Sequence, residues 1–427
     1  MQTLKLSRPQ RLLGLALILA TACACAAEPL TMDAAYLRYA KERIAAKDPA
    51  YAAPMDKLLH DADALLARPS DSVVNKTMLP PSGDKHDYMS LAPYFWPDPG
   101  KPGGLPYLRR DGQFNPAAKN GDTDSVRMHA LCTGVEKLAL AYYFSGEAKY
   151  ADKAAEAIRS WFLAPATRMN PNLNYGQAVM GRNTGRGIGL IDTRDFWMVI
   201  DALPLIAPSG ALSADETAGL RQWFRDFMAW MRDTDIGKSE AAAANNHGMY
   251  YDMQVAVYAL FVGDAALARA TVRHALDQRI AVQVDKDGKQ PRELERTTPF
   301  HYSVFNLEAM EQLARYGEQV GVDVWHAHEQ DTGLRKALDY LLPYALHPAS
   351  WPYHELRKLE PELMLPLLLR ADRAYGPGSY APAVAALPNS RAKPAEAASA
   401  PLAAGGDELD LLIWPLKPPG RSQAPPK

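Results

Sequence analysis

The sequence predicts an all-helical protein that is not an open repeat array, and three observations support that prediction. Apolar residues recur at spacings of three and four in many segments, as they do on the buried face of an α-helix. Short alternating β-branched runs joined by hairpin turns are nearly absent. No motif returns at a fixed period of the kind that marks helical repeat arrays. Helices with almost no strands between them must pack on one another, so we expect a single domain of packed helices.

The expected helices can be placed along the chain. The first runs from Met32 to about Leu66, and good N-caps precede two later ones, at Asp124 and at Ser213. Two long segments, 80–120 and 169–189, break the helical pattern with Pro, Gly and Asn, and loops this long inside a compact domain are usually functional. The other expected helices are Ser125–Phe144, Tyr150–Phe162, Asp192–Ala202, Ala214–Arg232, Gly248–Val262, Ala265–Gln283, Ser303–Tyr316, Gly333–Leu342 and Glu355–Tyr375.

The N-terminus has the pattern of a secretory signal peptide. Basic residues precede a short apolar run over 12–20, and small residues follow it. We therefore expect residues 1–27 to be removed and the mature protein to be periplasmic or secreted. A lipid anchor on Cys23 or Cys25 is the alternative, and it would tether the same domain to a membrane surface.

Composition limits the class of partner and of fold. The formal net charge of -2 provides no global basic field, which argues against nucleic acid as the main partner. Once the leader is removed, only Cys132 remains, so a large core rather than a disulfide must stabilise the protein. No other segment is long and apolar enough to span a bilayer. We expect a monomer with its domain at 28–392 and an Ala/Pro-rich tail at 393–427, of which 409–416 returns to pack.

Two loops have the side chains that an acidic sugar needs. The first, 85–99, combines charge with aromatic stacking faces, and its alternative role is a structural plug over one end of the domain. The second, 170–187, is rich in amides and in Arg, which can grip a carboxylate with two hydrogen bonds. Its alternative role is a solvated, turn-rich loop. The candidate binding residues, with one from a later stretch, are Lys85, His86, Tyr88, Trp96, Asn172, Asn174, Tyr175, Arg182, Arg186 and His301.

Two further stretches hold candidate catalytic groups. Asn246 and His247 lie where an Ala-rich helix meets the next apolar run, and the paired asparagines at 245–246 are poor helix formers. Arg296 and Tyr302 lie on either side of Pro299, just ahead of an amphipathic helix. Each stretch also has a structural interpretation. His247 can be a histidine whose hydrogen bonds are made within the fold. The stretch with Arg296 and Tyr302 can be a surface loop whose ion pairs contribute little to stability.

These residue types suit elimination from a uronate. The proton at C5 is very weakly acidic while the neighbouring carboxylate is charged, so donors must stabilise the developing negative charge. A base must take the C5 proton, and an acid must protonate the departing O4. Asn246 and Arg296 can supply the donors, and His247 and Tyr302 can serve as base and acid. This chemistry requires no metal or organic cofactor, and the histidines are scattered without metal-ligand spacing.

The motifs Lys85-His86-Asp87-Tyr88, Asn245-Asn246-His247-Gly248, Glu295-Arg296 and His301-Tyr302 resemble those of the alginate lyase family of polysaccharide lyases. The resemblance extends over most of the mature chain. It implies an incomplete (α/α) toroid of antiparallel helical hairpins with a substrate cleft across one end. It also implies Asn246 at the substrate carboxylate, His247 and Tyr302 as base and acid, and Arg296 assisting. For mannuronate, the resemblance also allows Tyr302 to act as both base and acid. His301 is an alternative to His247 as the base.

Some features depart from the biosynthetic alginate lyases. Gly248 after the Asn-His pair and the long Trp-Pro-Asp-Pro-Gly loop are similar to a broader branch, which is also similar to enzymes acting on other β-linked uronates, including glucuronan. We therefore expect cleavage of alginate or polymannuronate first and glucuronan second. A glycoside hydrolase is one alternative, although no pair of carboxylates is singled out as its acid and base. A non-catalytic protein that binds acidic polysaccharide is the other, since it could use the same loops.

Overall fold

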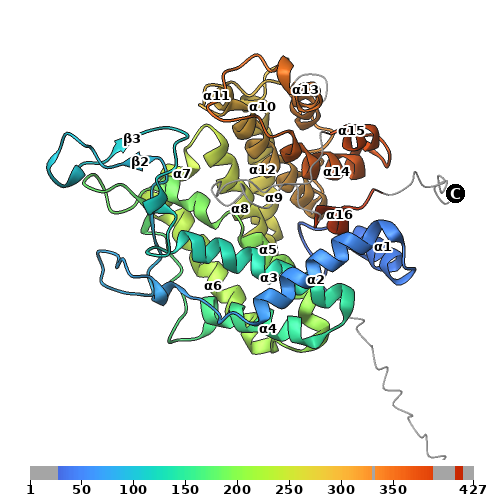
Figure 1. Cartoon of the computed structure of the whole chain (residues 1–427), viewed down its shortest axis with the longest axis horizontal. Helices are drawn as coiled ribbons and strands as arrows, with labels where there is room; N and C mark the ends of the chain where they lie inside the picture. The colour runs from blue at the N-terminus through green and yellow to red at the C-terminus, as the bar shows by residue number, and fades with distance from the viewer. Residues whose placement is uncertain (1–26, 329–331, 388–408, 417–427) are drawn as a thin grey trace, which may run out of the picture.

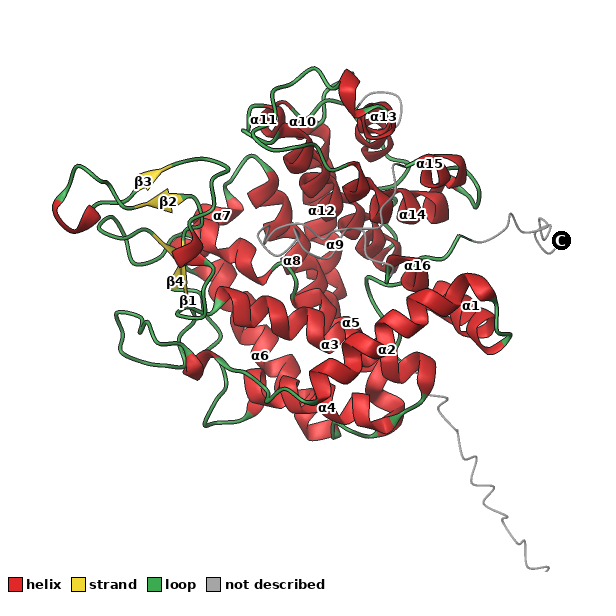
Figure 2. Ribbon diagram, in the orientation of Figure 1, coloured by secondary structure: helices red, strands yellow, loops and turns green. Residues whose placement is uncertain are grey.

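The computed structural model describes residues 27–328, 332–387 and 409–416, and within these ranges most residues are helical (Figure 2). The prediction of a helical fold is confirmed, with only four short strands among the described residues. The leader expected at 1–27, apart from its last residue, lies outside the described ranges, as does most of the tail expected at 393–427. None of the described helices is long and apolar enough to cross a membrane.

The helices follow one another with short connections over most of the chain (Figure 1). In chain order they are α1 (Ala34–Ala45), α2 (Ala52–Leu66), α3 (Ser125–Ser145), α4 (Ala148–Ile158), α5 (Phe196–Ile206), α6 (Ala214–Asp233), α7 (Asp235–Ala241), α8 (Asn246–Val262), α9 (Ala265–His274), α10 (Ala281–Gln283), α11 (Pro291–Leu294), α12 (Pro299–Val320), α13 (Leu334–Leu346), α14 (Met364–Tyr375), α15 (Ala381–Ala386) and α16 (Asp410–Ile413).

Local sequence signals explain why these helices begin where they do. Helix α6 opens with a capping box, in which the Ser213 hydroxyl accepts from the Glu216 backbone N–H and the Glu216 carboxylate accepts from the Ser213 N–H. Its apolar residues then recur every three or four positions and face the core. Those that are buried include Leu220, Phe224, Phe227 and Met231.

Helices α8 and α12 lie at the centre of the fold. Helix α8 packs against α6, α9 and α12, while α12 also contacts α13 and α14, and α3 packs against α2, α4 and α5. Most residues of α8 and α12 are buried on all sides, as expected for helices surrounded by others. The N-terminal ends of these two central helices are therefore held in fixed positions.

Several boundaries differ from the sequence-based expectations because of proline and turn chemistry. The helix expected over 32–66 is two helices, separated by a 3₁₀ turn that begins at Pro49. Helix α14 begins at Met364 rather than at Glu355, since a 3₁₀ turn opening at Pro361 precedes it. The helix expected at 192–202 begins only at Phe196, because 187–193 form another 3₁₀ turn. Helix α7 was not predicted.

The two long loops are joined by short strands at one edge of the molecule (Figure 1). Strand β1 (Met89–Leu91) pairs in parallel with β4 (Tyr175–Ala178), and β2 (Phe95–Trp96) pairs antiparallel with β3 (Leu108–Arg109). A fully buried ion pair, Lys76 Nζ to Asp124 Oδ2 at 3.1 Å, lies beneath β1, and the same carboxylate oxygen accepts the Met89 N–H. The loops are thus fixed to the helical body.

The ends of the described chain also pack on the helices. The Asp201 carboxylate on α5 accepts backbone N–H groups of Leu30, Thr31 and Met32, at 2.7–2.9 Å for the shortest contact to each. Helix α16 contacts α1, α2 and α14, and the side chains of Ile413 and Trp414 are buried. Segment 409–416 therefore forms part of the folded body.

Candidate active site

A cavity of about 450 Å³ lies where the two long loops meet the N-terminal ends of α8 and α12. All four residues predicted as catalytic line it. Helix α8 supplies Asn246 and His247, α12 supplies Tyr302, and the turn between α11 and α12 supplies Arg296. The structure thus brings together two pairs of groups that lie about 50 residues apart in the chain, although their individual roles stay predictions.

Tyr302 lies in the first turn of α12, just after Pro299, whose fixed φ suits the start of a helix. Its side chain is 5% exposed, and its hydroxyl lies 2.7 Å from the Tyr94 hydroxyl. Burial raises the pKa of Tyr302 well above its usual value of 10, and the nearby Arg296 only partly opposes that effect. At neutral pH Tyr302 is therefore a neutral hydroxyl that can donate a proton.

Arg296 is held between an aromatic ring and a carboxylate. Its guanidinium carbon lies 3.6 Å from the centroid of the Tyr302 ring. Its Nη2 and Nε donate to the two oxygens of Asp111 at 2.9 and 3.2 Å. Burial by itself would raise the pKa of Asp111, but the charge and hydrogen bonds of Arg296 lower it, so the carboxylate stays ionised. The cation of Arg296 is consequently fixed at the cavity wall.

His247 lies in the first turn of α8 and is oriented by a buried carboxylate. Its Nδ1 is 2.7 Å from Oε1 of Glu240 on α7, and Glu240 is only 2% exposed. A carboxylate at this distance favours the tautomer with hydrogen on Nδ1. Nε2 is then the nitrogen that can accept a proton.

Asn246 is 1% exposed and is fixed by a second buried carboxylate. Its backbone N–H donates to Oε1 of Glu293 at 2.7 Å, and its Nδ2 donates to Oε2 at 2.6 Å. Burial raises the pKa of Glu293, while these two hydrogen bonds oppose the rise. Oδ1 of Asn246 has no hydrogen-bond partner within the described ranges. The amide is thus held with one Nδ2 hydrogen committed to Glu293 and the other available.

Gly248 allows the turn before α8 to come close to its neighbours. A Cβ at this position would lie 2.0 Å from the carbonyl oxygen of Ala243 and 2.1 Å from Nη1 of Arg279. Arg279 donates to the carbonyls of Ala241 and Ala243 and forms an ion pair with Asp252. Only glycine leaves room for these contacts of Arg279, which hold the start of α8 and thereby position Asn246 and His247.

The lining of the cavity is strongly cationic. Among the described residues that line it there is one carboxylate, that of Asp192. Burial lowers the pKa of Lys119. Arg186 donates hydrogen bonds to the backbone and side-chain oxygens of Gln177 at 3.0 and 3.2 Å, and these bonds hold it in place. An excess of positive charge in a cleft attracts an anionic substrate. The cationic side chains are Arg109, Lys119, Arg186, Arg194 and Arg296.

Most of the binding residues predicted from the loops do not line this cavity. Arg186 does, whereas Tyr88 is fully buried and donates to Asp192 at 3.0 Å. Trp96 Nε1 donates to the Gln113 carbonyl. The others make contacts within or beneath the loops or project from them, and their part in binding a longer substrate stays a prediction. They are Lys85, His86, Asn172, Asn174, Tyr175 and Arg182.

His301 also lies outside the cavity lining. Its ring stacks parallel to that of Phe305, with centroids 6.1 Å apart. Burial, together with the charges of Arg357, Arg194 and Arg296, lowers the pKa of His301 to about 4. The ring is therefore neutral at pH 7, and it also packs edge-on against the ring of Tyr302.

Sequence reasoning missed Gln177 and Tyr94, although both lie in the two loops it singled out. Gln177 has a φ of 48°, in the left-handed region that non-glycine residues seldom adopt. Its Nε2 donates to Asp192 at 2.9 Å, and its backbone N–H donates to Ser90. Strained backbone of this kind concentrates at functional sites, but it cannot be read from the sequence.

Comparisons with known proteins identify the family of the chain. The family model for alginate lyase matches residues 72–351. The crystal structure of an alginate lyase from Bacteroides ovatus is 37% identical to this chain, with a TM-score of 0.83, and covers 92% of this chain and 100% of that one. No curated protein matches the chain.

A more distant likeness is one of fold alone. A histidine-to-alanine variant of alginate lyase A1-III, an enzyme of Sphingomonas species A1, was solved in complex with a tetrasaccharide. It is 13% identical to this chain, with a TM-score of 0.51, and covers 83% of this chain and 90% of that one. The family match spans most of the helical domain and the Bacteroides enzyme aligns over its full length, so this chain belongs to the alginate lyase family and is a polysaccharide lyase.

Proposed function

We propose that the protein cleaves a β-linked uronate polymer by β-elimination, with alginate rich in mannuronate as the first substrate and glucuronan as the second. The observation that carries this proposal is the meeting of Asn246, His247, Arg296 and Tyr302 around one cavity whose lining is strongly cationic. The names of the similar solved structures, which are alginate lyases, support alginate as the first choice.

In the proposed reaction, Nε2 of His247 takes the C5 proton of the uronate. The electron pair of the C5–H bond forms the C4–C5 double bond, and the C4–O4 bond breaks with its electrons going to O4. Tyr302 donates its hydroxyl proton to that oxygen, so the leaving chain departs as a neutral alcohol. Proton exchange with water then restores both residues. The raised pKa of Tyr302 suits the acid role, because it keeps the hydroxyl protonated until O4 develops charge.

The carboxylate next to C5 must be stabilised while the proton leaves. Arg296, fixed by Asp111, supplies a cation, and the second Nδ2 hydrogen of Asn246 supplies a neutral donor. Arg186 lies in the same lining and can bind a neighbouring carboxylate of the polymer. The carboxylates of Asp111 and Glu293 hold Arg296 and Asn246 in place before substrate arrives, which reduces the reorganisation needed in the transition state.

The identity of the base can be argued from the same contacts. Tyr302 as both base and acid would have to lose its proton first, and burial opposes that loss. His301 is neutral but stacks on Phe305 outside the lining. His247 has its Nδ1 bound by Glu240 and lines the cavity, so it is the base we propose.

We further propose that the helices form an incomplete (α/α) toroid over 28–392 and that the mature protein acts as a monomer in the periplasm or outside the cell. The sequential packing of the helices and the match to the Bacteroides enzyme support the toroid. The leader pattern at 1–27 supports export.

The proposal is tested by the ultraviolet absorbance of an unsaturated uronate. Purified mature protein is offered polymannuronate, polyguluronate, glucuronan and a neutral glycan, in parallel with Tyr302→Phe, His247→Ala and the remote control Tyr51→Phe. Absorbance should rise with one uronate polymer, be abolished in the first two variants and persist in the control. New reducing ends without absorbance would indicate a glycoside hydrolase instead, and silence in both assays would indicate a binding protein.

A further inference from the structure

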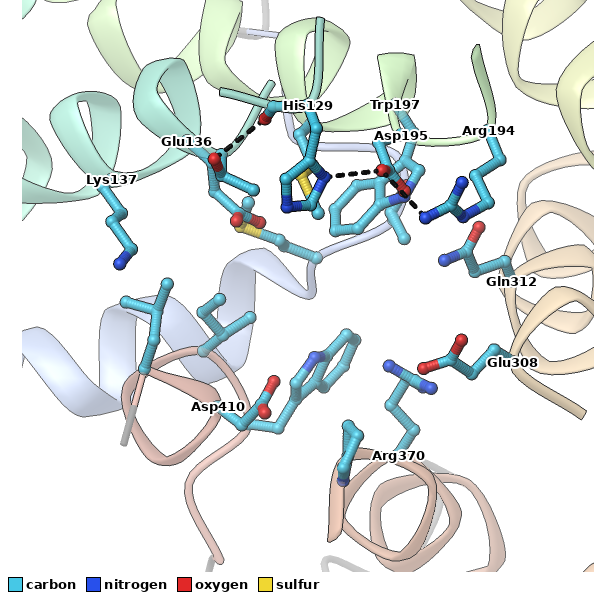
Figure 3. Close-up of a pocket in the computed structure, with 18 of the residues that line it drawn as sticks. His129, Glu136, Lys137, Arg194, Asp195, Trp197, Glu308, Gln312, Arg370 and Asp410 are labelled. Carbon is cyan, nitrogen blue, oxygen red and sulfur yellow. Dashed lines mark hydrogen bonds and ion pairs between the residues drawn. The ribbon is translucent and has the colours of Figure 1, made fainter. Parts of the chain in front are cut away.

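Most cations that line the catalytic cavity already share a carboxylate. Arg296 and Arg109 both donate to Oδ1 of Asp111, at 2.9 and 2.8 Å. Nη2 of Arg194 lies 3.5 Å from Oδ2 of Asp195, and this pair also lines a second cavity (Figure 3). A cation that already has a carboxylate partner attracts a further anion less strongly. Cations without such a partner are therefore the better candidates for the carboxylates that a uronate polymer has on every ring.

Two cations of the lining, Arg186 and Lys119, form no ion pair within the described part of the chain. Arg186 stacks on Phe95, with 5.1 Å between its guanidinium carbon and the ring centroid. Burial lowers the pKa of Arg186, and the nearby carboxylates of Asp192 and Glu240 partly oppose that effect. Glu240 is the partner of the proposed base, so Arg186 lies on the side of the base.

Arg357 is a third unpaired cation, and it lies on the side of the proposed acid. Its guanidinium carbon is 5.4 Å from the centroid of the Phe114 ring, and among the described residues no carboxylate forms an ion pair with it. The ring centroids of Phe114 and Tyr94 are 5.0 Å apart, and the Tyr94 hydroxyl meets that of Tyr302. Burial and then the charge of Arg357 lower the pKa of His301, which adjoins Tyr302. Two aromatic rings thus connect this arginine to the proposed acid.

The loop between α13 and α14, which contains this arginine, is fixed to the start of α12. The Leu356 N–H donates to the Thr297 carbonyl at 2.8 Å, and Oε1 of Glu355 accepts the Phe300 N–H at 2.8 Å. Gly112 allows the close approach of the neighbouring loop, since a Cβ there would lie 2.5 Å from Oγ1 of Thr297 and 2.9 Å from Cδ2 of Leu356. The arginine is therefore positioned before substrate arrives.

The direction of the polymer follows from the proposed reaction. Tyr302 delivers its proton to O4, so the ring whose C1 is joined to O4 lies beyond Tyr302, on the side of Arg357. A guanidinium that stacks on a ring keeps its N–H edge free, and that edge can bind a carboxylate with two hydrogen bonds.

We propose that Arg357, stacked on Phe114, binds the carboxylate of the uronate that leaves with O4. Arg186 faces the opposite neighbour of the reacting sugar, so the protein selects runs of consecutive uronates. A neutral sugar on the leaving side would leave Arg357 without a partner. This inference rests on the function proposed above.

The first test measures binding alone. A mannuronate tetramer is titrated calorimetrically into full mature protein with the Tyr302→Phe change, which keeps the ligand intact. Arg357→Met is compared in that background with Arg273→Met, a matched change of an exposed arginine on α9 outside the cavity lining. The Kd should weaken about fivefold or more in Arg357→Met and stay the same in Arg273→Met. Both melting temperatures should match that of the background protein, because both side chains are exposed.

The second test uses active protein with polymannuronate, intact or with half of its carboxylates reduced to alcohols. In Arg357→Met the KM for the intact polymer should rise about fivefold while kcat changes less than twofold, and the preference for the intact polymer should shrink. Equal Kd values for the two arginine variants would overturn the inference and leave the elimination reaction standing. A loss of kcat at unchanged KM would also overturn it. Weaker tetramer binding in Arg357→Met, in a protein that forms no unsaturated uronate, would support the carboxylate site and refute the proposed function.

Discussion

The contact between His247 and Glu240 provides a sharp test of the proposed base. Replacing Glu240 with glutamine keeps the side-chain shape and a hydrogen bond to Nδ1 but removes the negative charge, which lies 2.7 Å away in a residue that is 2% exposed. When His247 takes the C5 proton it becomes a cation. Two charges about 4 Å apart at an effective dielectric constant of about 20 interact by about 4 kcal/mol.

A neutral hydrogen bond from glutamine retains about 1 kcal/mol of that stabilisation. The transition state should therefore lose about 3 kcal/mol in Glu240→Gln, and kcat should fall about 100-fold. The assay is steady-state formation of unsaturated uronate from polymannuronate, with melting temperatures measured alongside. Glu136→Gln is the matched control, because it changes a buried glutamate outside the catalytic cavity and should keep kcat. A folded Glu240→Gln protein with the parental kcat would refute His247 as the base and favour Tyr302 in both roles.

Three further predictions concern stability and binding. Gly248→Ala places a Cβ 2.0 Å from the Ala243 oxygen, so chemical denaturation should show a loss of about 1–3 kcal/mol, with reduced activity. Burial raises the folded pKa of Glu136 to about 8, above the ordinary value of 4.5, so the folded state holds an extra proton between these two values and the associated stability is lost as pH rises from about 4.5 to 8; the melting temperature of Glu136→Gln should fall less than that of the parent between pH 5 and 8. Arg296→Lys loses the forked contact with Asp111 and the stack on Tyr302, and kcat/KM should fall by about tenfold or more.

Each of these has a result that would contradict it. If Gly248→Ala is as stable as the parent protein, Arg279 can shift to accommodate the added Cβ without loss of stability. Parallel pH profiles for Glu136→Gln and the parent would mean that Glu136 is ionised at neutral pH. Unaltered kinetics in Arg296→Lys would mean that any cation serves at that position.

Local sequence signals are enough to predict the helical class and to pick out the candidate catalytic motifs. The capping box at Ser213 and the apolar period that follows it define α6 without any distant contact. The Asn246-His247 and Arg296–Tyr302 stretches can also be recognised locally, because polar and charged residues there lie directly beside strong helix signals. Helix boundaries do not follow from local patterns where a 3₁₀ turn runs directly into a helix, as at 187–193 before α5.

Which loop side chains reach the cavity depends on contacts between segments that are far apart in the sequence. A loop has no period that tells which way a side chain points, so Tyr88 and Gln177 read alike in the sequence, yet Tyr88 is buried beneath the site and Gln177 lines it. The pairing of Met89 with Tyr175, which joins the two loops, links residues more than 80 positions apart. The carboxylates of Glu240 and Glu293, which orient His247 and Asn246, could not be recognised as partners, because hydrogen bonds depend on positions in space that only the folded chain defines.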